Sequence, residues 1–209
     1  MATQTDNFER IDSADLGTNW DPNTSTWRIT ANQAQVANAG ADAVETWNAN
    51  TFNNDQFSEA TLSVFTGVGT NDQSGVGFGV RWAAGVTKTG YWLICNEHAT
   101  LGATVARFDA GAYTFLAQRD ADWVQGDLAR LEISGQNLAV RKNGTQVGSA
   151  ISDPGGLASG RVALTYSSTA DITPSLDNWQ GGDLGGVVDN PRPRVNLRPA
   201  PFAPGYARR

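Results

Sequence analysis

The clearest alternation of apolar and polar residues lies between Leu128 and Gly148. A period of two is typical of an antiparallel strand with one buried face, and the apolar positions are Ala129, Leu131, Ile133, Leu138 and Val140. Gly135–Gln136 separates the first two segments, and Asn143-Gly144 follows the second. Asn-Gly favours a two-residue hairpin because both residues tolerate positive φ. The segment predicts a three-strand meander with one dry face.

The same period recurs in short segments along the chain, and no segment longer than about ten residues keeps a helical apolar period. We therefore expect an all-β protein, a two-sheet antiparallel sandwich of about a dozen short strands joined by turns. The remaining predicted strands are Asp6–Arg10, Thr26–Thr30, Gln33–Val36, Ala43–Asn48, Phe57–Thr66, Gly75–Trp82, Gly90–Cys95, Ala103–Phe108, Ala112–Gln118, Arg161–Tyr166 and Ser175–Trp179.

One predicted strand carries glycines on a single face. In Gly75–Trp82 the side chains of Val76, Phe78, Val80 and Trp82 share one face, whereas the other face holds Gly75, Gly77, Gly79 and Arg81. A row of glycines on a strand indicates that another group lies close to it, or that the sheet bends there.

Composition supports a β fold and restricts the chemistry. The 209 residues suffice for one large domain with a core, and 23 glycines, 7 tryptophans and 8 phenylalanines favour strands over helices. The single cysteine, Cys95, excludes an intramolecular disulfide, and its apolar surroundings predict a buried hydrophobic role. Met1–Asn7 has no secretion-signal pattern and no apolar run is long enough for a membrane span, so we expect synthesis in the cytoplasm and no membrane partner.

The net charge of −6 is distributed unevenly. Residues 187–209 hold five arginines, one aspartate and five of the eight prolines, whereas residues 1–186 hold 10 basic and 20 acidic residues. The chain is therefore predicted to consist of an acidic sandwich body, residues 1–186, and an extended Pro/Arg-rich C-terminal arm, residues 187–209.

The order of these features resembles the concanavalin A-like lectin/glucanase superfamily of jelly rolls, which includes laminin-G-type domains. The resemblance covers roughly residues 6–180 and is carried by Asp6-Asn7-Phe8, Trp20, Trp27, Gly75–Trp82, Gly90–Cys95, Leu128–Gly144, Gly160–Tyr166 and Leu176–Trp179. It implies a jelly-roll sandwich. The superfamily contains glycan-binding lectins, glycoside hydrolases and structural modules, so the resemblance alone does not choose among these functions.

The sequence does not favour catalysis. The hydrolase branch of the superfamily usually shows a Glu-x-Asp-x-x-Glu triplet, and a retaining glycosidase needs two carboxyl groups about 5 Å apart. This chain has no such triplet: Asp120 and Asp122 fall in a predicted loop, and Glu132 stands alone between two apolar residues. The only histidine, His98, excludes a His-rich metal site, and no Gly-x-Ser-x-Gly motif is present. We therefore predict a protein that is not an enzyme.

Candidate ligand contacts are aromatic side chains and His98. Trp47, Trp92, Tyr91 and Tyr113 are candidates for a platform that stacks on sugar rings, although tryptophan is also a natural filler of a sandwich core. His98 in a polar loop is either a solvated residue or a ligand contact.

No cofactor is predicted, and calcium is the one metal worth considering. Its candidate ligands are Asn53-Asn54-Asp55 and Asn71-Asp72, but turns favour the same residue types, and we expect the turn role.

The arm carries the sharper functional signal. Its prolines favour an extended chain, and its arginines alternate with apolar and aromatic residues in a way suited to docking on an acidic partner. The predicted docking residues are Arg192, Arg194, Leu197, Arg198, Phe202, Tyr206, Arg208 and Arg209. A disordered tail is the alternative, and a charge of +4 is small for nucleic acid binding.

A lectin-like body with a docking arm and no secretion signal resembles bacteriophage virion proteins. We therefore predict a virion structural protein, either a capsid decoration or a tail or fibre component, that binds other virion proteins through its arm. Such a protein would be made in the host cytoplasm and would act in a homo-oligomer or symmetric assembly, which raises the avidity of weak contacts. The alternative is a lectin for host-surface glycans, and a glycoside hydrolase is the third possibility.

Overall fold

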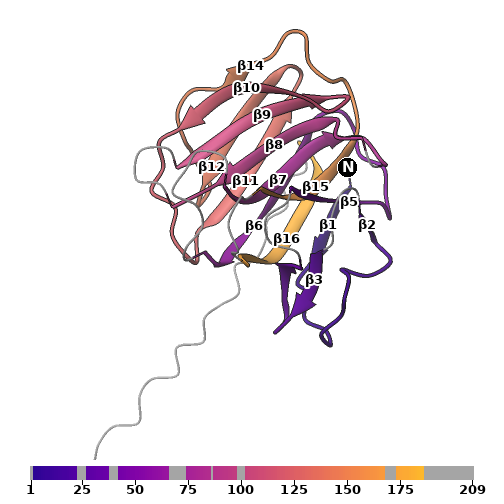
Figure 1. Ribbon diagram of the computed structural model, residues 1–209. Coiled ribbons are helices and arrows are strands. Elements are labelled where there is room, and N and C mark those ends of the chain that lie inside the picture. Colours follow the sequence, from indigo (N-terminus) through magenta and orange to yellow (C-terminus); the bar gives the residue numbers. More distant parts are fainter. Residues whose placement is uncertain are drawn as a thin grey trace, which may run out of the picture.

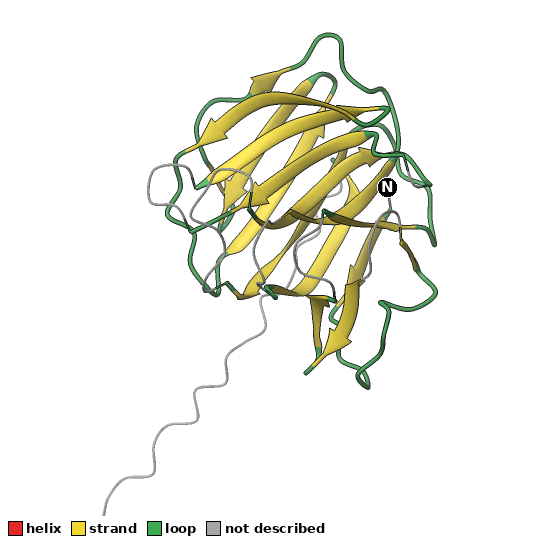
Figure 2. Ribbon diagram, viewed as in Figure 1, coloured by secondary structure: helices red, strands yellow, loops and turns green. Residues whose placement is uncertain are grey.

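The computed structural model describes residues 2–22, 27–37, 42–65, 74–85, 87–97, 102–167 and 173–185. Within these ranges the strands form two sheets that face each other, and all of their pairings are antiparallel (Figure 1). The predicted all-β sandwich is confirmed. In the described part of the chain no helix is long and apolar enough to cross a membrane, and Figure 2 shows only strands and loops there.

Sheet A has nine strands in the order β13-β12-β11-β6-β16-β4-β3, with β1 paired to β16 and β14 paired to β12. These strands are β1 (Thr3–Asp6), β3 (Trp27–Thr30), β4 (Gln33–Val36), β6 (Gln56–Val64), β11 (Leu128–Ser134), β12 (Asn137–Lys142), β13 (Thr145–Gln146), β14 (Ile151–Ser152) and β16 (Ser175–Asp183).

Sheet B has seven strands in the order β10-β9-β8-β7-β15-β5-β2. These strands are β2 (Trp20–Pro22), β5 (Ala43–Trp47), β7 (Gly75–Trp82), β8 (Gly90–Cys95), β9 (Ala103–Asp109), β10 (Ala112–Arg119) and β15 (Arg161–Ser167).

The main core lies between the sheets and follows the predicted alternation. Along β11 the buried residues are Ala129, Leu131 and Ile133, and Asn143 and Gly144 have the positive φ angles, 52° and 82°, that the hairpin requires. Large side chains from both sheets complete the core, among them Trp27, Leu62, Phe78, Leu93, Leu164, Tyr166 and Trp179. Cys95 belongs to this core and is fully buried, as predicted.

Glycines admit close contacts in sheet B, as the row in β7 predicts. A Cβ atom on Gly75 or Gly77 would lie 2.0 Å from a carbonyl oxygen of the neighbouring strand β8. A Cβ atom on Gly90 would lie 2.1 Å from the ring of Trp82. Trp82 packs on the outer face of the sheet and not on the face of Val76, Phe78 and Val80, so its predicted face is wrong. The alternation breaks at Arg81, which has a positive φ of 51° next to a register shift between β7 and β15.

The first predicted strand, Asp6–Arg10, is wrong in its bounds. The strand is β1, Thr3–Asp6, and the chain turns directly after it. The turn forms because the Asp6 carboxylate accepts the Phe8 N–H and the Phe8 carbonyl accepts the Arg10 N–H. Phe8 has a φ of 54° and is nevertheless fully buried, so its predicted inward orientation is confirmed.

Candidate functional site

A pocket of about 560 Å³ lies beside the connection that leads from β1 in sheet A to β2 in sheet B. Its volume is in the range of roughly 300–1,000 Å³ that is typical of small-molecule sites. Residues of β1, of the connection and of β5 line it, namely Thr5, Asp6, Asn7, Arg10, Leu16, Gly17, Thr18, Asn19 and Trp47.

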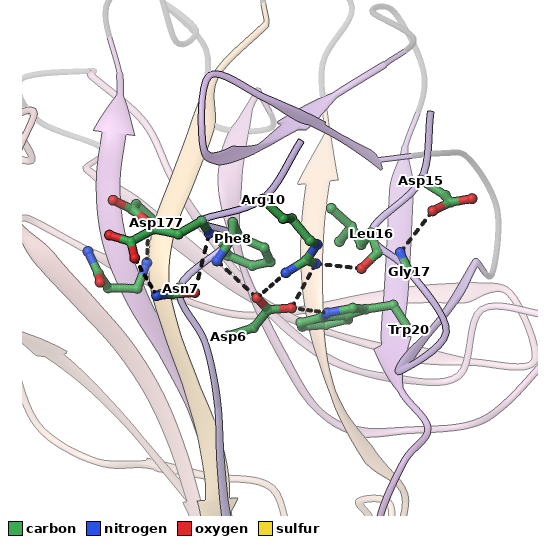
Figure 3. A network of polar contacts seen from close by, with 11 residues as sticks. Asp6, Asn7, Phe8, Arg10, Asp15, Leu16, Gly17, Trp20 and Asp177 are labelled. Atoms are coloured by element: carbon green, nitrogen blue, oxygen red, sulfur yellow. Dashed lines mark hydrogen bonds and ion pairs between the residues drawn. The ribbon is translucent and has the colours of Figure 1, made fainter. Parts of the chain in front are cut away.

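Asp6 is the central acceptor of the pocket (Figure 3). Its Oδ1 accepts the Phe8 N–H at 2.9 Å and Nη1 of Arg10 at 2.6 Å. Its Oδ2 accepts Nη2 of Arg10 at 3.0 Å and Nε1 of Trp20 at 2.9 Å. A carboxylate offers about four lone-pair sites, so these contacts use the accepting capacity of Asp6.

Arg10 links Asp6 to Leu16, which lies later in the connection between β1 and β2. Besides its two contacts with Asp6, the guanidinium donates from Nη2 to the carbonyl oxygen of Leu16 at 2.6 Å, and its carbon lies 5.5 Å from the centroid of the Phe8 ring. The side chain is 37% exposed. A guanidinium has five N–H groups, so two of them have no partner among the described residues.

Three tryptophans from three strands meet at the pocket. Trp47 stacks on Trp179 with centroids 4.9 Å apart, and Trp20 meets Trp47 edge-on at 5.2 Å. Trp20 donates its indole N–H to Asp6, and Trp179 donates its own to Oγ of Ser58 at 3.0 Å. The Trp47 indole N–H has no acceptor among the described residues, although the side chain is only 3% exposed.

The other polar lining residues are exposed: Thr5, Asn7, Thr18 and Asn19. The Asn7 amide donates to Glu9 at 2.9 Å, whereas the side chain of Asn19 makes no hydrogen bond within the described ranges. Hydroxyl and amide groups can both donate and accept hydrogen bonds, so this rim is suited to a ligand with many hydroxyl groups.

Glu45 lies on β5 two residues before Trp47, on the same face of the strand. Its Oε1 accepts the Trp27 N–H at 3.1 Å, and its Oε2 has no partner among the described residues. Burial raises the pKa of Glu45 to about 8, and the nearby carboxylates of Asp15 and Asp21 add to that rise. The carboxyl group is therefore mainly protonated at neutral pH.

The structure separates the four aromatic candidates, so the single aromatic platform is wrong. Trp47 lines the pocket, whereas Tyr91 is 1% exposed and belongs to the core between the sheets. Trp92 is 4% exposed and packs on Phe108 on the outer face of sheet B, next to Tyr113, which is 43% exposed. All seven tryptophans are buried: Trp20, Trp27, Trp47, Trp123 and Trp179 belong to the core between the sheets, as predicted for most of them, whereas Trp82 and Trp92 pack on the outer face of sheet B.

Glu132, which stands between two apolar residues in the sequence, belongs to an ion-pair network in the structure. On the outer face of sheet A, Arg130 contacts Glu132 at 2.7 Å and Glu59 at 3.4 Å, and Arg141 contacts Glu132 at 2.9 Å. Arg130 also lies 3.7 Å from the ring centroid of Phe57. Burial raises the pKa of Glu59. Each carboxylate is thus paired with arginine in a structural ion-pair network, and neither lines the pocket.

The calcium candidates in Asn53–Asp55 form hydrogen bonds that hold loops in place. The Asp55 carboxylate accepts from Ser134 and Gly135, and these hydrogen bonds lower its pKa, while Asn53 donates to Asp183. No three His, Cys, Asp or Glu side chains form a metal site in the described ranges. Asn71-Asp72, His98 and the whole arm, residues 187–209, lie outside the described residues.

Sequence reasoning missed Asp6, Arg10 and Asn19 as pocket residues. Asp6-Asn7 is a turn signal in its own right, and it indicates that a polar turn follows β1. The side-chain bond from Asp6 to Trp20 spans 14 residues and has no signature in the local pattern.

The fold is similar to solved structures at low sequence identity. A carbohydrate-binding module, CBM66 from Bacillus subtilis, has a TM-score of 0.64 and 17% identity over 79% of this chain and 96% of that chain. The exoplasmic/lumenal domain of VIP36 in its Ca²⁺/Man-bound form has a TM-score of 0.56 and 13% identity over 81% and 84%. No protein-family model and no curated protein matches the sequence.

A xylan β-1,4-xylosidase from Bacillus halodurans C-125 has a TM-score of 0.52 and 12% identity over 86% of this chain. The match covers 39% of that enzyme, so this chain corresponds to only part of its length. These likenesses show a lectin-like jelly-roll fold. They do not bear on the virion hypothesis, which stays a prediction from the sequence.

Proposed function

We propose that this protein is a carbohydrate-binding module, and that the pocket between Asp6, Arg10 and Trp47 is its sugar site. The observation that carries the proposal is a pocket lined by a buried tryptophan, Trp47, together with exposed amide and hydroxyl groups. Sugars present hydroxyl groups around a ring with apolar C–H faces, so they need this mixture of polar partners and aromatic surface.

The similar folds support the proposal, since they include a carbohydrate-binding module and a lectin domain in a Man-bound form. The pocket favours binding over hydrolysis. Glycoside hydrolysis needs two carboxyl groups with distinct roles, whereas Asp6, the single carboxylate among the described lining residues, already accepts four hydrogen bonds.

An array of immobilised oligosaccharides tests the proposal with three forms of the protein. Asn19→Ala removes an exposed side chain of the pocket rim, and Asn137→Ala removes an exposed side chain on β12 that does not line the pocket. We expect the wild type to bind, Asn19→Ala to bind about tenfold more weakly through loss of a direct hydrogen bond, and Asn137→Ala to bind like the wild type.

Two results would count against the proposal. Failure of the wild type to bind any oligosaccharide would remove the carbohydrate-binding function. Binding that Asn137→Ala weakens and Asn19→Ala does not would place the sugar at another surface.

A further inference from the structure

The hydrogen-bonding groups of the pocket are unequally used. Asp6 accepts four hydrogen bonds and offers about four lone-pair sites. No lone pair is therefore left to accept a hydrogen bond from a ligand. Arg10, in contrast, keeps two N–H groups without a partner among the described residues. The groups of the Asp6–Arg10 pair that can still form hydrogen bonds with a ligand are therefore donors, namely the N–H groups of Arg10.

Trp47 adds a donor that the fold does not use. It is one of five buried tryptophans whose indole N–H has no acceptor among the described residues, and it is the one of those five that lines the pocket. A buried donor without an acceptor costs about 1–3 kcal/mol. The indole nitrogen itself is closed to solvent, so the Trp47 side chain must turn toward the pocket before a ligand oxygen can supply the missing acceptor and remove that cost.

The charges beside the pocket act against an anionic ligand. The charge of Arg10 is matched by its two-point contact with Asp6. Glu9 accepts from the rim residue Asn7, and Asp15 accepts from Gly17 at the rim, so two further carboxylates lie next to the opening. A carboxylate or sulfate on the ligand would meet this excess negative charge.

An ammonium group would find no free lone pair on Asp6, the one carboxylate among the described lining residues, so its acceptors inside the pocket would be limited to the amide and hydroxyl groups of the rim. We infer that the pocket takes an uncharged sugar whose oxygen atoms accept hydrogen bonds from the Trp47 indole and from Arg10. This inference rests on the proposed function and specifies its ligand class.

The test uses an array that carries neutral oligosaccharides of glucose, mannose, galactose, xylose and fructose beside uronate, sialylated and sulfated ones. The variants are Trp47→Phe, which keeps an aromatic ring and removes the N–H, and Trp123→Phe. Trp123 is the matched control because its indole is equally buried and unpartnered within the described ranges but does not line the pocket. Melting curves verify that each variant is folded.

We expect the wild type to bind neutral oligosaccharides, with little change in signal as the salt concentration rises. Trp47→Phe should weaken this binding about tenfold, and Trp123→Phe should leave it unchanged. Binding restricted to acidic glycans would overturn the inference while leaving the proposed function standing. Equal binding by wild type and Trp47→Phe would overturn the role of the indole. No binding to any glycan would overturn the proposed function as well.

Discussion

Two acidic side chains near the pocket have opposite surroundings. Asp6 receives four hydrogen bonds, two of them from a guanidinium, whereas Glu45 receives one from a backbone N–H and has no cation beside it among the described residues. Burial without a guanidinium partner explains why Glu45 holds a proton at neutral pH.

Glu45 should make stability depend on pH. Its pKa is about 8 in the folded protein and about 4.5 without burial, so the folded state keeps a proton that the unfolded chain loses between these values. The favourable contribution is complete below about pH 4.5 and is lost as pH rises to about 8. We expect the free energy of unfolding to fall over this range by at most about 1.4 kcal/mol per pH unit.

Urea unfolding at several pH values measures this effect in wild type and in Glu45→Gln. Glutamine resembles the protonated acid and can still accept the Trp27 N–H, but it does not titrate. The variant should therefore lose the decline with pH. Identical pH profiles for the two proteins would show that Glu45 is ionised in the fold.

At the scale of elements, the loop after β14 is held to sheet B by one buried network. The Tyr91 hydroxyl donates to Asp153 at 2.9 Å and accepts the Leu157 N–H at 2.9 Å, while Arg107 pairs with Asp153 at 2.7 Å. Burial and the neighbouring carboxylate raise the pKa of Tyr91 to about 12, so the hydroxyl keeps its proton and its donor role.

Two adjacent glycines in this loop provide a matched pair of substitutions. A Cβ atom on Gly156 would lie 1.7 Å from the Tyr91 hydroxyl oxygen, whereas a Cβ atom on Gly155 would have no atom within 4 Å. Gly156→Ala should lower the free energy of unfolding by about 1–3 kcal/mol, and Gly155→Ala should change it little. Chemical denaturation measures both, and equal effects would contradict the proposed role of the network.

Most strands could be predicted from the sequence because the period of apolar residues is a local property of the chain. The predicted strands Gln33–Val36, Gly75–Trp82 and Gly90–Cys95 have the same bounds as β4, β7 and β8. The bounds of the first strand were predicted wrongly because the chain turns at Phe8. The positive φ of Phe8 depends on a hydrogen bond to the Asp6 side chain, and such a bond does not show in the pattern of apolar and polar residues.

The pocket was less predictable than the strands. Its lining residues come from β1, from β5 and from the connection between β1 and β2. Packing of the two sheets brings these segments together. Trp47 was a candidate because tryptophan suits sugars, but the same argument selected Tyr91 and Trp92, which lie elsewhere in the fold. Residue type alone cannot separate a core tryptophan from one that lines a pocket.

At the scale of the whole molecule, the described sandwich closes on itself before the arm begins. β16 pairs with β6, β4 and β1, and Asp183 at its end accepts the backbone N–H groups of Ala2 and Asn53. These contacts join the N-terminal strand to the last strand. A folded body that ends near Gly186 therefore stays our prediction for the domain boundary.

Truncation after Gly186 tests this boundary. We expect the shortened chain to melt at the temperature of the full chain and to give the same oligosaccharide binding, since all described lining residues of the pocket precede residue 48. A chain that no longer folds would show that residues 187–209 belong to the body. A chain that folds but no longer binds sugar would show that the arm contributes to the site.

The central claim is that the pocket holds an uncharged sugar against the Trp47 indole, and the most direct measurement is the amide and indole NMR spectrum of the ¹⁵N-labelled full chain. Trp47→Phe identifies the Trp47 indole signal, and Trp123→Phe identifies a control. Titration with glucose, mannose, galactose, xylose and fructose should shift the Trp47 signal with at least one sugar and leave the Trp123 signal in place. A Trp47 signal that none of these sugars moves would contradict the claim.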